Sequence, residues 1–196
     1  MKKQSLKERI KNMNKFLNDE YGLNVFGENK KIIKYGKSYV VLEVINNKNN
    51  NQIVGSYIRV GKSEKEEQKK QILKQGNEIL KYYSKNKITN YRIYIDIGKS
   101  SLNLNRKALN LLIKDIEEEK IKSLVITDIS RLYRNLADAS VFVEKTYLKN
   151  VKLISLDNSL ESTREFMNLL TYMPLNEETK DYNNDEEYEY YYDGIE

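Results

Sequence analysis

The chain has 196 residues, a length that is enough for one sizeable core with an appendage. Its formal net charge is +5, and it contains neither histidine nor cysteine. These absences exclude Ser-His-Asp and thiol catalysis, disulfides and the usual Cys/His zinc sites, so any nucleophile is a serine, threonine, tyrosine or carboxylate. No apolar run approaches the roughly 18 residues of a membrane-spanning helix, and the lysine-rich N-terminus lacks the apolar core of a signal peptide, so we expect a cytoplasmic protein.

Residues 1–50 predict a small basic αββ appendage, with 11 bases against five acids. Apolar residues at helical spacing indicate a helix that stops near Gly22, and two strand-like runs follow at 30–35 and 38–45. The polar run 46–52 then forms a linker. Two interpretations of the appendage remain open: it either contacts DNA as a small arm or simply packs on the main domain.

From Ile53 onward, strand and helix patterns alternate, which predicts an α/β fold: a mainly parallel sheet of about four to five strands with helices on both faces. This main domain covers residues 53–160. The expected strands are residues 53–60, 91–95, 123–127 and 151–156. The expected helices are residues 64–83, 107–119 and 136–149.

The C-terminal part differs sharply from this body. Residues 161–174 predict a short helix that ends at the only proline, and residues 175–196 predict a disordered acidic, tyrosine-rich tail. Residues 177–196 hold nine acids and one base, so the remaining chain has 33 bases and 20 acids, a charge of +13. This surplus points to a polyanionic partner, most simply nucleic acid. The tail either imitates DNA on the basic surface or serves as a solubilising end.

Four arginines stand out in a body whose bases are otherwise overwhelmingly lysine. Arg59 lies near the end of the first strand of the main domain, Arg106 closes a polar loop, and Arg131 and Arg134 follow the third strand three residues apart. An α/β sheet exposes side chains at such positions, so we expect all four to be exposed. Arginine binds phosphate in a bidentate way that lysine cannot reproduce, which favours a phosphate site over four unrelated surface side chains.

Several sequence blocks resemble, in order and spacing, the catalytic domain of serine recombinases, the resolvase/invertase family. These blocks are YIRV, the helix around Gln75, YIDIGKSSLNLNRKALNLLI and LVITDISRLYRN, and together they span about residues 53–160. The last block is most similar to large serine integrases, and SSLNLNRKAL is similar to serine transposases. The resemblance implies a resolvase-like fold.

In that family, a serine attacks a DNA phosphodiester and forms a 5′-phosphoserine link without a metal ion or other cofactor. The resemblance therefore implies double-stranded DNA as a partner and a homo-oligomer (dimer or tetramer), or a hetero-oligomer with an active recombinase, away from any membrane. Fixed positive donors would lower the pKa of the nucleophile and stabilise charge on the phosphoryl oxygens. The expected phosphate-binding residues are Arg59, Lys62, Arg106, Arg131 and Arg134, supported by Gln75, Asp96 and Ser130.

The chain departs from the family at the nucleophile, because Gly61 stands where the Arg-x-Ser pattern has its serine. Ser63, two residues later, is the candidate catalytic nucleophile. However, Ser63 and Glu66 also form a capping-box pattern, which would commit the Ser63 hydroxyl to a backbone N–H. Two functions remain open: a site-specific recombinase or transposase that cuts through Ser63, and a non-catalytic regulatory or DNA-binding partner of an active recombinase.

Overall fold

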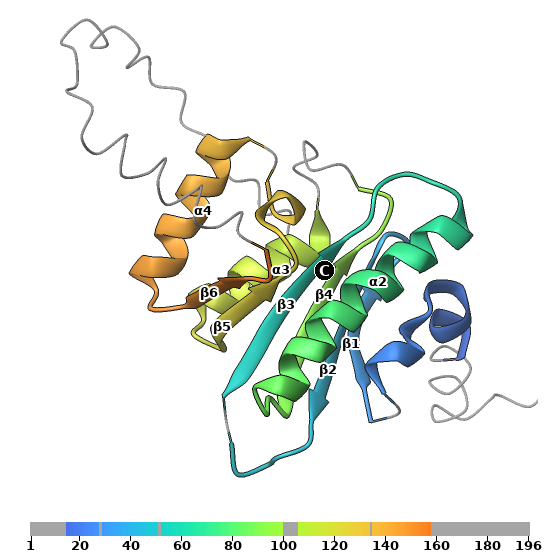
Figure 1. Cartoon of the computed structure of the whole chain (residues 1–196), viewed down its shortest axis with the longest axis horizontal. Coiled ribbons are helices and arrows are strands. Elements are labelled where there is room, and N and C mark those ends of the chain that lie inside the picture. The colour runs from blue at the N-terminus through green and yellow to red at the C-terminus, as the bar shows by residue number, and fades with distance from the viewer. Residues whose placement is uncertain (1–14, 28, 51, 100–105, 134, 158–196) are drawn as a thin grey trace, which may run out of the picture.

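The computed structural model describes residues 15–157 apart from residues 28, 51, 100–105 and 134 (Figure 1). The predicted helix 161–174, the tail 175–196 and Arg134 therefore lie outside the described residues. The strands are β1 (Lys31–Gly36), β2 (Tyr39–Ile45), β3 (Ile53–Arg59), β4 (Asn90–Asp96), β5 (Ile121–Ile126) and β6 (Lys152–Ser155). The helices are α2 (Lys65–Lys85), α3 (Lys107–Glu117) and α4 (Leu136–Leu148), with the short turns η1 (Leu23–Phe26) and η2 (Ile129–Arg131). Residues 15–21 are also helical.

All six strands form one sheet in the order β1-β2-β4-β3-β5-β6. The pairs β4-β3, β3-β5 and β5-β6 are parallel, whereas β1-β2 and β2-β4 are antiparallel. The predicted mainly parallel α/β fold is thus confirmed. The sheet is larger than the four to five strands expected, because β2 pairs with β4 along its whole length, from Tyr39 opposite Asp96 to Ile45 opposite Asn90.

Strand β2 lies inside the sheet, between β1 and β4, and it has buried side chains on both faces. Val40, Leu42 and Val44 pack on the side of α2, and Val41 packs on the side of α3. A strand with two buried faces reads as a nearly continuous apolar run, and in Tyr39–Ile45 the only charged residue is Glu43. The two strands expected in an N-terminal appendage therefore extend the main sheet.

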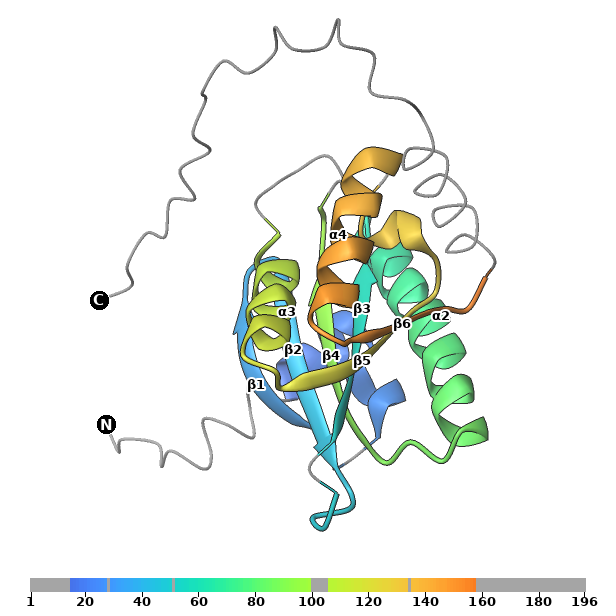
Figure 2. The same cartoon turned by 90° about the vertical axis from the view of Figure 1, so that its left-hand side faces the viewer.

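Helices cover the sheet on both faces, which gives the protein two apolar layers (Figures 1 and 2). On one face, Ile72, Ile79 and Tyr83 of α2 pack on the sheet together with Leu23 and Phe26 of η1. On the other face, α3 and α4 lie next to each other, and their buried side chains include Leu109, Leu112, Ala139 and Phe142. No helix in the described part of the chain is both long and apolar enough to cross a membrane.

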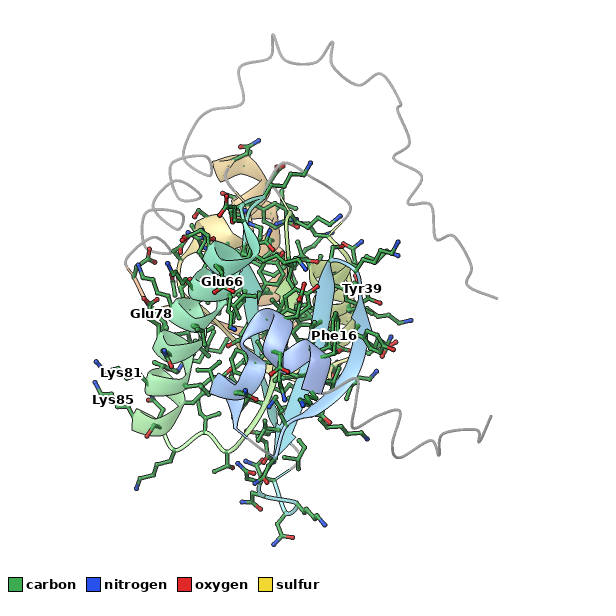
Figure 3. All side chains as sticks on the ribbon, turned by 90° about the vertical axis from the view of Figure 1, so that its right-hand side faces the viewer. Phe16, Tyr39, Glu66, Glu78, Lys81 and Lys85 are labelled. Atoms are coloured by element: carbon green, nitrogen blue, oxygen red, sulfur yellow. The ribbon has the colours of Figure 1, made fainter. Side chains whose placement is uncertain are left out.

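The segment before β1 packs tightly on α2 because α2 has a glycine at the point of contact. A Cβ atom on Gly76 would lie 2.9 Å from Cζ of the buried Phe26 ring, closer than real contacts allow. Figure 3 shows the helix that carries Phe16 beside α2, whose Lys81 and Lys85 point away from the protein. The close approach of η1 to α2 therefore depends on Gly76.

A half-buried polar network joins β2, β4 and α3. Arg92 of β4 forms ion pairs with Glu43 of β2 and, at 2.7 Å, with Asp115 of α3. The hydroxyl of Tyr94 also donates to Asp115, at 2.5 Å. Burial alone would raise the pKa of the Asp115 carboxyl, but the hydrogen bonds from Tyr94 and Arg92 hold it below its ordinary value.

Candidate phosphate-binding site

The predicted site residues lie where the carboxyl ends of parallel strands meet. Arg59 ends β3, Asp96 is its register partner at the end of β4, and Asp128 follows β5. The chain after β3 and the chain after β4 remain joined, since Val60 N–H donates to Asp96 O and Lys99 N–H donates to Val60 O, both at 3.0 Å. This edge of an α/β sheet is the usual position of ligand sites, because loops and helix N-termini gather there.

Arg59 is buried, with only 5% of its surface exposed, and its guanidinium bonds to backbone carbonyls of two loops. Nε donates to Arg131 O at 3.0 Å, Nη2 to Ser130 O at 3.1 Å, and Nη1 to Lys99 O at 3.1 Å. The prediction that Arg59 is exposed was wrong, because carbonyls of η2 and of the loop after β4 point at the end of β3. Arg59 thus fixes both loops against the sheet.

Arg106 is also buried, at 2% exposure, so the prediction of its exposure was wrong for the same reason. Its Nη1 donates to Leu132 O and, at 3.4 Å, to Arg131 O. The guanidinium carbon lies 4.8 Å from the centroid of the Tyr133 ring, a cation–π contact. Its buried Nε has no hydrogen-bond partner among the described residues. Arg106 therefore fixes the chain segment that follows η2.

Arg131 differs from these two arginines because it faces outward. Its side chain is 31% exposed, and its Nε donates to Asp128 Oδ2 at 2.9 Å. The other Asp128 oxygen accepts a hydrogen bond from the Ser130 hydroxyl. The two terminal nitrogens of Arg131 make no hydrogen bond to a described residue, so a bidentate fork is available to an anion. Asp128 was not among the predicted site residues, although its spacing of three from Arg131 allows such a pair.

Asp96 supports the site from within the core. Its fully buried carboxylate accepts hydrogen bonds from the backbone N–H groups of Ala108 and Leu109, at 3.0 and 3.1 Å, and so caps α3. The Tyr57 hydroxyl donates to the same carboxylate at 2.9 Å. Burial raises the pKa of the Asp96 carboxyl, while these hydrogen bonds oppose the rise. Burial also raises the pKa of Tyr57, which keeps its hydroxyl proton in place.

Gln75 supports Arg59 from α2. Its Nε2 donates to Arg59 O at 3.2 Å and to Gln71 O at 3.3 Å, and the residue is buried. Its Oε1 has no hydrogen-bond partner among the described residues. Gln75 therefore holds the backbone at the end of β3.

The loop between β3 and α2 has room for a side chain at its first residue. A Cβ atom on Gly61 would meet no atom within 4 Å, and Gly61 is not among the glycines with positive φ. Gln68 Nε2 closes the loop by donating to Gly61 O at 3.3 Å and Ser63 O at 3.0 Å. Lys62 and Ser63 are both exposed.

The predicted capping box at Ser63 and Glu66 was wrong. Helix α2 begins at Lys65, and its N-cap is Glu64, whose side chain makes no capping hydrogen bond. The N-cap is set by the residue whose backbone is extended, and Glu64 has φ −60° and ψ 152°. Ser63 therefore lies one residue before the N-cap of α2.

A comparison with known protein families identifies the family of this chain. Residues 54–175, more than half of the chain, match the family model described as Resolvase, N terminal domain. The chain belongs to the resolvase family. No curated protein sequence matches it.

Three solved structures are similar to this resolvase-family chain. The N-terminal catalytic domain of TP901-1 integrase is 25% identical, with a TM-score of 0.49, over 62% of this chain and 100% of that chain. The C-terminal catalytic domain of ISC1926 TnpA, an IS607-like serine recombinase, is 26% identical, with a TM-score of 0.44, over 60% and 81%. A resolvase family site-specific recombinase from Streptococcus pneumoniae is 23% identical, with a TM-score of 0.42, over 60% and 93%. Family membership rests on the family model, since all three TM-scores are below 0.5.

The resolvase-family site thus has an inner and an outer part. Arg59, Arg106, Gln75 and Asp96 are buried and hold backbone groups, while Arg131 and Lys62 reach solvent. Ser130 joins the two parts, because its carbonyl accepts from Arg59 and its hydroxyl donates to Asp128. Within the described ranges, no group of three acidic side chains is placed to hold a metal ion.

Proposed function

We propose that this resolvase-family protein binds the phosphate backbone of double-stranded DNA without cutting it, as a regulatory or DNA-binding partner of an active recombinase. The observation that carries this proposal is Gly61, which has no side chain where the family pattern has its nucleophilic serine. A phosphoserine intermediate cannot form at a glycine. The rest of the site keeps its basic side chains, so phosphate binding does not depend on the missing hydroxyl.

The free fork of Arg131 and the exposed ammonium of Lys62 are the donors we assign to a DNA phosphate. In this proposal, Arg59 and Arg106 act indirectly, because their guanidinium groups hold the carbonyls of residues 130–132. A charge of +13 on the chain outside residues 177–196 supports a polyanionic ligand.

A second candidate function is DNA cleavage through Ser63. One observation favours it: the Ser63 hydroxyl is exposed and is not used to cap α2. For this function, the loop 61–64 would have to shift by two residues, so that Ser63 takes the position of Gly61. A misplacement of about 1 Å can already cost on the order of a hundredfold in rate.

Two measurements on the full chain separate these functions. Fluorescence anisotropy with a labelled DNA duplex at several salt concentrations tests binding, and we expect Arg131→Ala to reduce the slope of log K against log salt by about 0.9. The matched control is Lys122→Ala, which removes an exposed, ion-paired base at the start of β5. A wild-type protein without salt-dependent DNA binding would overturn the proposal.

Cleavage is tested with a nicked suicide duplex followed by a denaturing gel. We expect no covalent adduct with the wild-type chain when binding is saturated. An adduct that disappears in Ser63→Ala would establish the second function instead. Because the target sequence is not defined by these residues, the assay uses a pool of random duplexes selected for binding.

A further inference from the structure

Strand β1 forms one edge of the sheet (Figure 2). Among the described strands it pairs with β2 alone, so its outer side offers backbone N–H and C=O groups to another extended chain. The strand at the other edge, β6, has four residues against six in β1. A short edge strand offers less to a partner, so β1 is the more open of the two edges.

The outer edge of β1 is basic. Lys31, Lys34 and Lys37 are exposed, and none of them forms an ion pair with a described residue. No acidic residue occurs in the sequence from residue 29 to residue 42. Lysines on an edge strand prevent it from pairing with its own copy, because like charges repel. The same lysines attract a strand that is acidic.

The register of β1 with β2 sorts its side chains onto the two faces of the sheet, because directly opposite residues share a face. Lys34 is opposite Val41, which packs on the side of α3. Lys31 is on the same face, since a bulge in β1 offsets its odd distance from Lys34. Tyr35, which is 51% exposed, is opposite Val40 on the side of α2. The edge therefore has two lysines on one face and an aromatic ring on the other.

The acidic segment 185–190 has the complementary pattern in its sequence. Side chains of an extended chain alternate between two faces. Positions 185, 187 and 189 are all acids and would share one face, while Tyr188 and Tyr190 would share the other. Tyrosine is also among the residues favoured in strands. An extended segment 185–190 would thus match both the lysines and the ring of β1.

The segment has enough chain to reach β1. The last described residue, Asp157, follows β6 at the opposite edge of the sheet. Neighbouring strands are about 4.8 Å apart, so roughly 24 Å separates the two edges of a six-stranded sheet. Residues 158–184 can span up to about 90 Å when extended. Because the segment belongs to the same chain, its pairing with β1 is intramolecular and is not weakened by dilution.

We propose that residues 185–190 pair with the open edge of β1 as an additional strand, parallel to β1. Glu187 then lies beside Lys31, and Glu189 lies beside Lys34. Neighbouring side chains of opposite charge stabilise a sheet, and the backbone of the segment satisfies the N–H and C=O groups of the edge. The pairing neutralises lysines that would otherwise attract a polyanion, so the segment regulates the basic surface of its own chain.

The aromatic side chains favour the parallel direction. In this direction Tyr190 lies beside Tyr35 on the α2 face, and aromatic pairs are among the cross-strand pairs that stabilise a sheet. An antiparallel segment with its acids beside the same lysines would place Glu186 beside Tyr35 instead. The parallel direction therefore places no charge against the exposed ring.

The geometry of an edge favours a peptide over DNA as the ligand of these lysines. Phosphate oxygens accept hydrogen bonds and donate none, so a DNA backbone would leave the outer C=O groups of β1 without a protein donor. An extended peptide supplies N–H donors and C=O acceptors together.

Disulfide formation in the full chain tests the register, because the chain has no cysteine. We expect Tyr35→Cys/Tyr190→Cys to form an internal disulfide on mild oxidation, at a rate that does not depend on protein concentration. The control Tyr35→Cys/Tyr191→Cys puts the second thiol on the other face and should react about tenfold more slowly. Equal rates for the two pairs, or linked dimers in place of the internal bond, would overturn the proposal. A faster reaction of Tyr35→Cys/Glu186→Cys would overturn the parallel direction.

Charge reversal tests the acid–lysine pairs in the same Tyr35→Cys/Tyr190→Cys chain. Lys31→Glu with Lys34→Glu should slow formation of the internal disulfide roughly tenfold, because like charges then lie side by side. Further exchange of both acids, at positions 187 and 189, for lysine should restore the rate.

The matched control is Lys81→Glu with Lys85→Glu, two exposed changes on α2 that should leave the rate unchanged (Figure 3). If the α2 changes slowed the reaction as much as the β1 changes, net charge alone would hold the segment, and the proposal would fail.

Anisotropy with a labelled duplex provides the last distinction. If Lys31→Glu with Lys34→Glu lowered the DNA affinity of the full chain but left the disulfide rate unchanged, the edge would be a DNA surface and the proposal would fail. The cross-linking rates are measured without DNA. A failure of the proposed DNA binding would therefore leave them unaffected, and the two proposals are tested separately.

Discussion

Tyr57 donates its hydroxyl hydrogen to Oδ2 of Asp96 at 2.9 Å, from one strand to its neighbour in the centre of the sheet. The same carboxylate accepts the N–H groups of Ala108 and Leu109 at the start of α3. Arg106 immediately precedes this helix, so its position depends on a carboxylate that is completely buried.

We expect Asp96→Ala to lower the free energy of unfolding by about 3 kcal/mol or more, because three buried donors lose their acceptor. Urea denaturation of the purified chain measures this loss. Asp96→Asn retains one acceptor oxygen and should lose less. If both variants were as stable as the wild-type chain, the capping of α3 by Asp96 would not contribute to stability.

Gly61→Ser should restore a nucleophile at little cost in stability. The Cβ position is open, so we expect the free energy of unfolding to change by less than about 0.5 kcal/mol. We also expect a covalent adduct on a nicked suicide duplex, detected on a denaturing gel, which Gly61→Ala does not form. If the adduct is missing from a stable Gly61→Ser protein that binds DNA, the site lacks more than its serine.

Gly76→Ala tests how the segment before β1 is held. In an ordinary helix this change would stabilise by up to about 1 kcal/mol, but here the new methyl group meets the Phe26 ring at 2.9 Å. We expect a net loss of about 1 kcal/mol in urea denaturation, since overpacking a core site costs roughly 1–3 kcal/mol. Phe26→Leu should remove the conflict, so that Gly76→Ala becomes stabilising in that background. Asn77→Ala, on the exposed face of α2, is the control.

The Asp115 network should contribute a pH-dependent part of the stability. The folded-state pKa of Asp115 is depressed below its ordinary value of 3.8, so its stabilisation is present above that value and is lost as pH falls through the folded-state pKa. We therefore expect the stability difference between the wild type and Asp115→Asn to be constant above about pH 5 and to shrink below about pH 4. Parallel pH curves for the two proteins would contradict this assignment.

Deletion of residues 177–196 should tighten DNA binding, because the nine acids in this segment compete with DNA for a body of charge +13. Anisotropy titrations of the truncated and full chains at several salt concentrations measure the effect, which should be greatest at low salt. Equal affinities and equal salt slopes would show that the tail does not compete.

The sequence predicted the elements of the main domain well, because apolar periodicity reports which side chains are buried along a strand or helix. It could not reveal that β2 pairs with β4, since such pairing joins segments about 50 residues apart. The burial of Arg59 and Arg106 could not be predicted, because the carbonyl groups that they contact belong to residues far away along the chain. Likewise, the capping pattern at Ser63 does not determine which residue is the N-cap, and in the structure the N-cap is Glu64.

The match to the resolvase family begins at residue 54, but the apolar layer beneath α2 begins earlier, with Leu17, Leu23 and Phe26. Strand β2, also outside the match, occupies the edge of β4 along seven residues. The family match and the packed core therefore have different N-terminal boundaries in this protein. Cutting the chain at the family boundary would uncover an inner strand, so an isolated module would have an unpaired edge that is open to aggregation.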